Sequence, residues 1–181
     1  MKLLHTAVLA ASLLSSVAQA KDLTVGLAAA PTSMDQQFYV IGSNSAMARN
    51  MFDGLVNQDA KQRIEPGLAQ SWKVLDDRTW EFKLRPNTKF HDGAALTAED
   101  VAASIKRVAL AAKNSPSSFA AYVKAIVETT AVDPLTLRIK TDGPTPLLLN
   151  NLSRIAILPA KMEAVRTEAL NAGKGVVGTG P

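Results

Sequence analysis

The sequence predicts a mixed α/β fold of the α+β kind, in which antiparallel hairpins pack against amphipathic helices. Two segments, Thr79–Leu84 and Leu135–Lys140, alternate apolar and polar residues with a period of two, which is typical of half-buried strands. A third segment, from Thr97 to Leu110, carries apolar residues at helical spacing. Strands and helices of this kind bury one face each, so we expect them to share one core.

The first 20 residues predict an export signal. Lys2 supplies a positive start, Leu3–Val17 is an apolar stretch, and Ala18-Gln19-Ala20 is a small-x-small cleavage pattern. A membrane-spanning helix is disfavoured because hydroxyl residues interrupt the stretch, which is shorter than the roughly 20 apolar residues such a helix needs. The chain has no Cys, so no thiol-linked lipid anchor can form. We expect a free protein of the periplasm.

The composition excludes several classes of chemistry. Without Cys there are no disulfides, thiolate metal sites or Cys nucleophiles. Loss of Lys2 with the leader leaves 19 basic against 16 acidic residues, a net charge of +3 with the signs interspersed. Because aromatic residues make up only 5% and the basic residues are not clustered, no nucleic-acid surface is predicted. We expect Lys106-Arg107 to lie on a solvated helix face.

A strand, a turn and a helix are predicted near the start of the mature chain. Lys21–Ala28 alternates apolar with polar or small residues, which favours a strand, and Pro31 follows in a turn. Either Ser43 or Asn44 can cap a helix that runs from Ser45 to about Phe52. The next short strand is expected at Leu55-Val56.

The middle of the chain predicts one hairpin and one capped helix. Glu65–Trp72 is expected to form a turn with one helical turn, followed by a hairpin of Lys73–Leu75 with Thr79–Leu84. In this hairpin Trp72 faces Phe82 as an ordinary cross-strand pair, and both tryptophans are expected in the core. Thr97 is a natural N-cap, and Asp100 imitates a capping box imperfectly because it is shorter than Glu.

The remaining elements follow from the same rules. We expect a short amphipathic element at Phe119–Ile126 and a second hairpin around Val132–Pro134. Thr145 should cap a helix with Pro146 in its first turn, and Gly173 should end the last helix. The predicted ranges are strands at 127–131, 135–140 and 154–158, and helices at 146–152 and 159–172.

No catalytic residue, metal ligand or cofactor site is predicted. His91 is the one histidine after the leader, and its neighbour Asp92 would point to the opposite face of a strand, so a structural turn is expected there. The carboxylate pairs Asp76-Asp77 and Glu99-Asp100 are expected to be solvated, with no apolar pocket to raise a pKa. Neither a Gly-x-Ser-x-Gly nor a Ser-x-x-Lys motif is present.

Six short motifs in fixed order resemble the peptide, nickel and oligopeptide class of extracytoplasmic solute-binding proteins, which deliver cargo to ABC importers. Asn87-Thr88 departs from the Gly-Val that usually stands there, which affects a turn preference and not the fold. The motifs are Phe52-Asp53-Gly54-Leu55-Val56, Pro66-Gly67-Leu68-Ala69-Gln70-Ser71-Trp72, Trp80-Glu81-Phe82-Lys83-Leu84-Arg85, Lys89-Phe90-His91-Asp92-Gly93, Leu96-Thr97-Ala98-Glu99-Asp100-Val101 and Gly178-Thr179-Gly180-Pro181.

The resemblance implies the N-terminal part of a two-lobed, periplasmic-binding-protein-like fold with an extra subdomain. It places residues 21–45 in the larger ligand-binding lobe, 46–172 in the accessory subdomain and 173–181 in a segment that returns to the lobe. By this resemblance the chain is expected to be roughly a third of a complete binding protein. Cargo would be held between two lobes that close by a hinge.

The same resemblance suggests a binding site and partners. The segment between the first strand and the first helix would line the cleft, with Gly42 allowing a close approach to the backbone. Expected partners are a peptide or small-molecule ligand and the permease subunits of the inner membrane, with the protein itself a monomer that performs no catalysis. Two alternatives remain open, an exported hydrolase and a sensor-linked receptor on the same scaffold. The candidate ligand-binding residues are Phe38, Tyr39, Gly42, Ser43 and Asn44.

Overall fold

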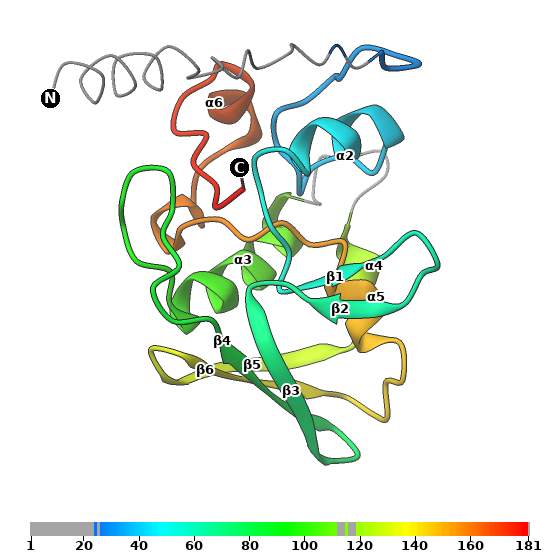
Figure 1. The fold of residues 1–181 in the computed structure, drawn as a ribbon, viewed down its shortest axis with the longest axis vertical. Helices are drawn as coiled ribbons and strands as arrows, with labels where there is room; N and C mark the ends of the chain where they lie inside the picture. The colour runs from blue at the N-terminus through cyan, green and yellow to red at the C-terminus, as the bar shows by residue number, and fades with distance from the viewer. Residues whose placement is uncertain (1–23, 25, 112–114, 116–118, 181) are drawn as a thin grey trace, which may run out of the picture.

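The computed structural model describes residues 24, 26–111, 115 and 119–180. Figure 1 shows a four-stranded sheet at one end of the molecule with helix α3 (Ala98–Ala111) lying over it. Helices α2 (Gly42–Ala48) and α6 (Thr167–Asn171) are at the opposite end. The predicted export signal and half of the strand predicted at 21–28 lie outside the described residues. The strand prediction is wrong for the described half, residues 24 and 26–28, which are not in a strand.

Two hairpins form the sheet and confirm the mixed α/β prediction. Strands β3 (Ala69–Asp76) and β4 (Thr79–Leu84) make the first hairpin, and β5 (Ile126–Asp133) and β6 (Thr136–Thr141) make the second. The strand order is β3-β4-β6-β5, with every neighbouring pair antiparallel. The two predicted hairpins therefore join through their second strands.

One face of the sheet packs on α3 and forms the main core. Phe82 lies opposite Trp72 on β3 and Leu137 on β6, which confirms the predicted cross-strand pair. Phe82 and Leu137 have no exposed surface, and Val101 on α3 is equally buried. Trp80 stacks on Phe82 with ring centroids 6.5 Å apart, and both tryptophans are partly buried against this core. Burial of each large apolar side chain here contributes about 1.5–3 kcal/mol.

The other face of the sheet carries charged side chains that pair across strands. Glu81 on β4 accepts a hydrogen bond from Arg138 Nε at 2.9 Å and lies 3.1 Å from Lys73 Nζ. The hydrogen bonds from Arg138 and then Lys73 hold the pKa of Glu81 below its ordinary value of 4.5. Glu81 is therefore charged throughout the physiological pH range.

The turn and helical turn predicted for Glu65–Trp72 are wrong. A small two-stranded sheet of β1 (Val56–Gln58) and β2 (Ile64–Pro66) leads directly into β3. Leu68 and Ala69 donate their backbone N–H groups to the carbonyls of Gly54 and Leu55, at 3.1 and 2.8 Å. The backbone of this segment is thus paired with distant chain, which leaves no helical hydrogen bonds to form.

The start of α3 confirms the predicted capping by Asp100 but not its exposure. Asp100 Oδ2 accepts hydrogen bonds from the backbone N–H and the hydroxyl of Thr97, at 2.8 and 2.9 Å. The other oxygen, Oδ1, accepts from Ala160 N at 2.7 Å, and the residue is only 8% exposed. The expectation that Glu99-Asp100 would be solvated is therefore wrong for Asp100, which links α3 to a later segment.

Shorter helices replace the longer ones predicted in the second half. Helix α4 (Ala120–Val123) lies within the amphipathic element predicted there. Helix α5 spans Leu148–Leu152 with no side-chain cap. The predicted cap is wrong, because the Thr145 hydroxyl donates to the carbonyl of Gly143 at 3.0 Å instead.

The last predicted strand and helix also differ from the structure. Residues 155–158 are buried but make only one isolated bridge, between Ala156 and Gly54. The single helix predicted for 159–172 is divided into a 3-10 turn η3 (Ala160–Met162) and α6. Gly173, at φ +72°, follows α6 as predicted for a helix end.

The final described segment packs against the start of the first motif. Gly180 N donates to the carbonyl of Met51 at 3.1 Å, and the Thr179 hydroxyl donates to Asp53 Oδ2 at 3.0 Å. His91 contacts the same segment, since Gly178 N donates to its Nδ1 at 3.3 Å and its Nε2 lies 2.9 Å from the carbonyl of Gly180. His91 therefore lies in a turn, as predicted, and its ring contacts the final segment.

Candidate functional site

The segment Phe38–Asn44, which carries the five candidate ligand residues, runs from a buried polar cluster into helix α2. The helix begins at Gly42, with Ile41 as its N-cap and no side-chain cap. Both predictions for its start, at Ser45 and with Ser43 or Asn44 as cap, are wrong. The helix starts earlier, since Ser45 N already donates to the carbonyl of Ile41 at 3.0 Å.

Asn44 lies within α2 and contacts an earlier part of the chain. Its Oδ1 accepts a hydrogen bond from the backbone N–H of Thr32 at 2.8 Å, and its Nδ2 lies 3.3 Å from the Thr32 hydroxyl. The residue is only 1% exposed. In this structure the Asn44 amide therefore fastens α2 to the chain that precedes the candidate segment.

Gly42 and Ser43 have different environments at the start of α2. Gly42 is exposed, and a Cβ atom added to it would meet no heavy atom within 4 Å. The fold itself therefore does not require glycine at this position. The Ser43 hydroxyl is buried and has no hydrogen-bond partner among the described residues.

Phe38 and Tyr39 are both partly buried, and Phe38 lines a cavity of about 370 Å³ between α3 and α6. Leu110 and Val165 supply apolar walls of this cavity, and Thr167 and Asn171 supply polar ones. Phe38 N donates to the carbonyl of Asp35 at 3.1 Å, so the start of the candidate segment is tied to the polar cluster before it.

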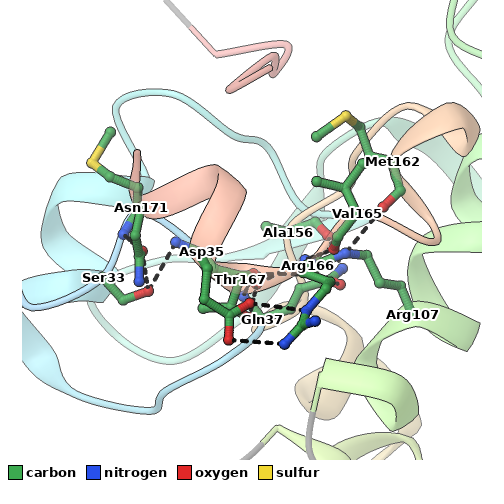
Figure 2. Close-up of polar contacts among 12 residues, drawn as sticks. Ser33, Asp35, Gln37, Arg107, Ala156, Met162, Val165, Arg166, Thr167 and Asn171 are labelled. Atoms are coloured by element: carbon green, nitrogen blue, oxygen red, sulfur yellow. Dashed lines mark hydrogen bonds and ion pairs between the residues drawn. The ribbon is translucent and has the colours of Figure 1, made fainter. Parts of the chain in front are cut away.

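The polar cluster is centred on an ion pair between Asp35 and Arg107, shown in Figure 2. Arg107 Nη1 donates to Asp35 Oδ1 at 2.9 Å and Nη2 donates to Oδ2 at 2.7 Å, a bidentate arrangement. Asp35 also accepts from Gln37 N at 3.1 Å and from the Thr167 hydroxyl at 2.7 Å. The side chain of Asp35 has no exposed surface and that of Arg107 is 2% exposed.

All five N–H groups of Arg107 have an acceptor. Besides the two bonds to Asp35, Nη1 donates to Gln37 Oε1 at 3.1 Å. Nε donates to the carbonyl of Met162 at 3.2 Å and Nη2 to that of Val165 at 2.9 Å. Met162 is the last residue of η3 and Val165 lies between η3 and α6, so Arg107 contacts the chain where the predicted helix is divided. We call Asp35, Gln37, Arg107 and Thr167 the Arg107 cluster.

Gln37 extends the Arg107 cluster into the core. Its Nε2 donates to the carbonyls of Ser104 at 3.1 Å and Ala156 at 2.8 Å. The amide nitrogen of Gln37 therefore joins α3 to the buried 155–158 segment, while its Oε1 accepts a hydrogen bond from Arg107 Nη1. Since every polar group of this kind is costly to bury without a partner, the residues are held in one arrangement.

The sequence prediction for Lys106-Arg107 is wrong for the arginine. Lys106 is exposed as expected and pairs with Glu163 at 2.6 Å, whereas Arg107 is buried. One signal was available: Arg107 follows the buried Ser104 by three residues, which places both on one side of α3. Its acceptors come from far away in the sequence, so the signal was too weak to use alone.

The candidate segment offers hydrogen-bonding groups and packing surface. Within the part of the chain that the structure describes, no group of three or more His, Asp or Glu side chains could hold a metal ion. None of the described helices has the length and apolarity needed to cross a membrane.

Comparison with known proteins finds relatives that are much longer than this chain. The periplasmic murein peptide-binding protein MppA of Escherichia coli K12 is 34% identical over 166 residues, which cover 83% of this chain and 31% of MppA. The glutathione-binding protein GsiB of Pectobacterium atrosepticum is 31% identical over 182 residues, which cover 99% of this chain and 35% of GsiB. The chain thus spans about a third of the length of these relatives.

A solved structure shows the same fold. Haemophilus influenzae OppA in complex with the peptide RPPGFSPFR has a TM-score of 0.71 and 26% identity, covering 84% of this chain and 33% of OppA. These findings confirm the resemblance carried by the six motifs and the fold class it implied. A family model also matches residues 63–181, and the chain belongs to the bacterial extracellular solute-binding proteins, family 5.

Proposed function

We propose that this chain is part of the substrate-binding component of an ABC importer, which captures peptides or similar small solutes in the periplasm for a membrane permease. The observation that carries the proposal is the open backbone at Gly42, at the end of a segment that the Arg107 cluster and Asn44 hold in place. Cargo can approach such a backbone closely, and a preorganised segment loses little entropy when it binds.

The chemistry of the segment favours binding by shape and hydrogen bonds. Ser43 supplies a hydroxyl with no partner among the described residues, and a buried hydroxyl left unpaired costs about 1–3 kcal/mol. Tyr39 supplies an amphipathic ring and Phe38 an apolar one. A cargo that satisfies these groups is preferred over one that leaves them unpaired, which gives specificity without a covalent step.

The relatives support a solute-binding role and differ in their cargo. By name MppA binds murein peptide and GsiB binds glutathione, and OppA was solved with a nine-residue peptide. The proposal therefore covers peptides and small polar solutes as a class. In it, residues 21–45 and 173–181 belong to the ligand-binding lobe and 46–172 form the accessory subdomain of a monomer exported by residues 1–20. Most of the pocket is supplied by the other two thirds of the protein.

The test is a ligand-dependent rise in the melting temperature of the full-length protein. The panel contains di-, tri- and oligopeptides, glutathione, a nickel–histidine complex and opines. A ligand at 100 times its Kd stabilises the folded state by about 2.7 kcal/mol, which is easily measured. If no member of the panel shifts the melting temperature, or if a chromogenic peptide or ester is hydrolysed, the proposal is wrong.

A matched pair of variants locates the site. Gly42→Ala and Gly143→Ala each add one methyl group where no heavy atom lies within 4 Å, so both variants should fold normally. Only Gly42→Ala should weaken cargo binding, because only that methyl group would stand between the cargo and the backbone. Equal affinities for the two variants, measured by titration calorimetry, would remove Gly42 from the site.

A further inference from the structure

We infer that Arg107 is a positioning residue for cargo, which sets the affinity of the binding segment without touching the ligand. The inference rests on the proposed function, since it takes Phe38–Asn44 as the segment that contacts cargo. It concerns a residue on the sheet-covering helix α3, far in sequence from that segment.

The contacts of Arg107 converge on the residues that immediately precede the binding segment. Three of its five hydrogen bonds go to Asp35 and Gln37. Phe38 N is bonded to the carbonyl of Asp35, so the position of Asp35 is passed directly to the first residue of the segment. At the other end, Asn44 is bonded to Thr32. The segment is therefore held by polar contacts at both ends.

The remaining contacts fix Arg107 itself. Met162 and Val165 present their carbonyls to Nε and Nη2, and the stem of Arg107 belongs to helix α3. Thr167, the first residue of α6, adds a hydrogen bond to the same Asp35 oxygen that receives Nη2. Figure 2 shows the guanidinium between the Asp35 side and the Met162–Val165 side of the cluster. Three separate parts of the chain thus meet at one side chain.

The chemistry of arginine is needed for this arrangement. A guanidinium presents five N–H donors in one plane, and here three of them meet acceptors on Asp35 and Gln37 while two meet the carbonyls of Met162 and Val165. A lysine ammonium has three donors and no planar fork, so it cannot serve Asp35, Gln37, Met162 and Val165 together. Arg107→Lys keeps the positive charge but loses the planar set of five donors. The variant therefore separates the effect of the charge from the effect of the hydrogen-bond geometry.

Arg107 acts through the segment because, although it lines the cavity beside Phe38, it has little exposed surface and no unused donor. Its side chain is 2% exposed and its donors are already used, so no free donor remains for a ligand. A buried ion pair of this kind contributes little net stability compared with apolar residues of the same volume, and its best-attested value is in specifying one arrangement. The expected consequence is a preorganised segment, which binds cargo with less loss of conformational entropy.

The test compares cargo affinity in full-length variants with that of a control destabilised elsewhere. The test variants are Arg107→Lys and Thr167→Val. The control is Leu137→Ala, which removes core packing from β6, a strand that carries no residue of the Arg107 cluster. Affinity for the cargo identified in the thermal panel is measured well below each melting temperature. Arg107→Lys should bind at least tenfold more weakly, Thr167→Val two- to fivefold, and Leu137→Ala within twofold of the unaltered protein.

A second readout distinguishes positioning from general destabilisation. Amide hydrogen exchange should accelerate in residues 38–44 of both test variants, while exchange in β4 remains unchanged; the control should show the reverse. If Arg107→Lys fails to fold, Thr167→Val alone decides, since it removes one hydroxyl and keeps the ion pair.

The outcomes are distinct. Affinity in Arg107→Lys and Thr167→Val within twofold of the unaltered protein, or losses no larger than in the control, would overturn the positioning role. Failure of the unaltered protein to bind any cargo would instead refute the proposed function.

Discussion

Replacing Gly178 by alanine should destabilise the protein strongly, because the return segment passes against Met51. A Cβ atom at Gly178 would lie 1.8 Å from the Met51 carbonyl oxygen and 2.7 Å from Phe52 Cδ1. Real Cβ contacts essentially never fall below 3.0 Å, so the oxygen would have to retreat by at least 1.2 Å. A side-chain rotation cannot relieve this clash because the obstacle is backbone.

The magnitude follows from what that movement disrupts. Overpacking of a close contact costs about 1–3 kcal/mol. The Met51 oxygen also accepts the hydrogen bond from Gly180 N at 3.1 Å, and loss of one such bond costs about 1 kcal/mol. Together these effects predict a loss of about 2–4 kcal/mol of unfolding free energy.

The assay is urea unfolding of the full-length protein followed by circular dichroism, with Gly143→Ala as control. Gly143 has open space around its Cβ position and no positive φ. Alanine there should therefore stabilise the protein slightly, by less than about 1 kcal/mol. Equal midpoints for the two variants would refute the close approach of the return segment to Met51.

Three further predictions concern other parts of the structure. Phe82→Ala should cost about 3–5 kcal/mol by leaving a core cavity, whereas Val74→Ala, on a side chain that is 55% exposed, should leave the melting temperature nearly unchanged. Glu81 has a folded pKa below its ordinary 4.5, so its contribution to stability is present above about pH 4.5 and is lost as the pH falls through the folded value. Glu81→Gln should therefore reduce the dependence of the melting temperature on pH below 4.5, and an unchanged slope would contradict this. His91→Ala should accelerate amide exchange at Gly178, whose N–H loses its acceptor; unaltered protection there would show that the imidazole is dispensable.

The sequence predicted the elements whose pattern is local. The alternation in Thr79–Leu84 and Leu135–Lys140 gave both hairpins, because side-chain period reports directly which face of a strand is buried. The capping of α3 by Asp100 was also readable, since cap and helix are adjacent. The family could also be recognised, since each of the six motifs is a short run of consecutive residues and they occur in a fixed order.

The features that were missed depend on partners far along the chain. Residues 69–72 form a strand because β4 and the Gly54-Leu55 backbone pair with them. Asn44 is used by Thr32, so it does not cap α2. Arg107 looked like a surface residue because its acceptors, Asp35 and Val165, lie 72 and 58 residues away. No local pattern reports such contacts.

Residues 54–177 begin and end at one place, because the chain returns to the point from which it left. The chain leaves through Met51–Asp53 and comes back at Gly178–Gly180, and hydrogen bonds of 3.1 and 3.0 Å join the two passages. The two ends of the intervening chain are therefore held side by side. Because loop length enters the closure entropy only logarithmically, changes in the length of exposed loops between these passages should cost little, whereas exchange of the whole segment would also remove Arg107 from its contacts with Asp35 and Gln37.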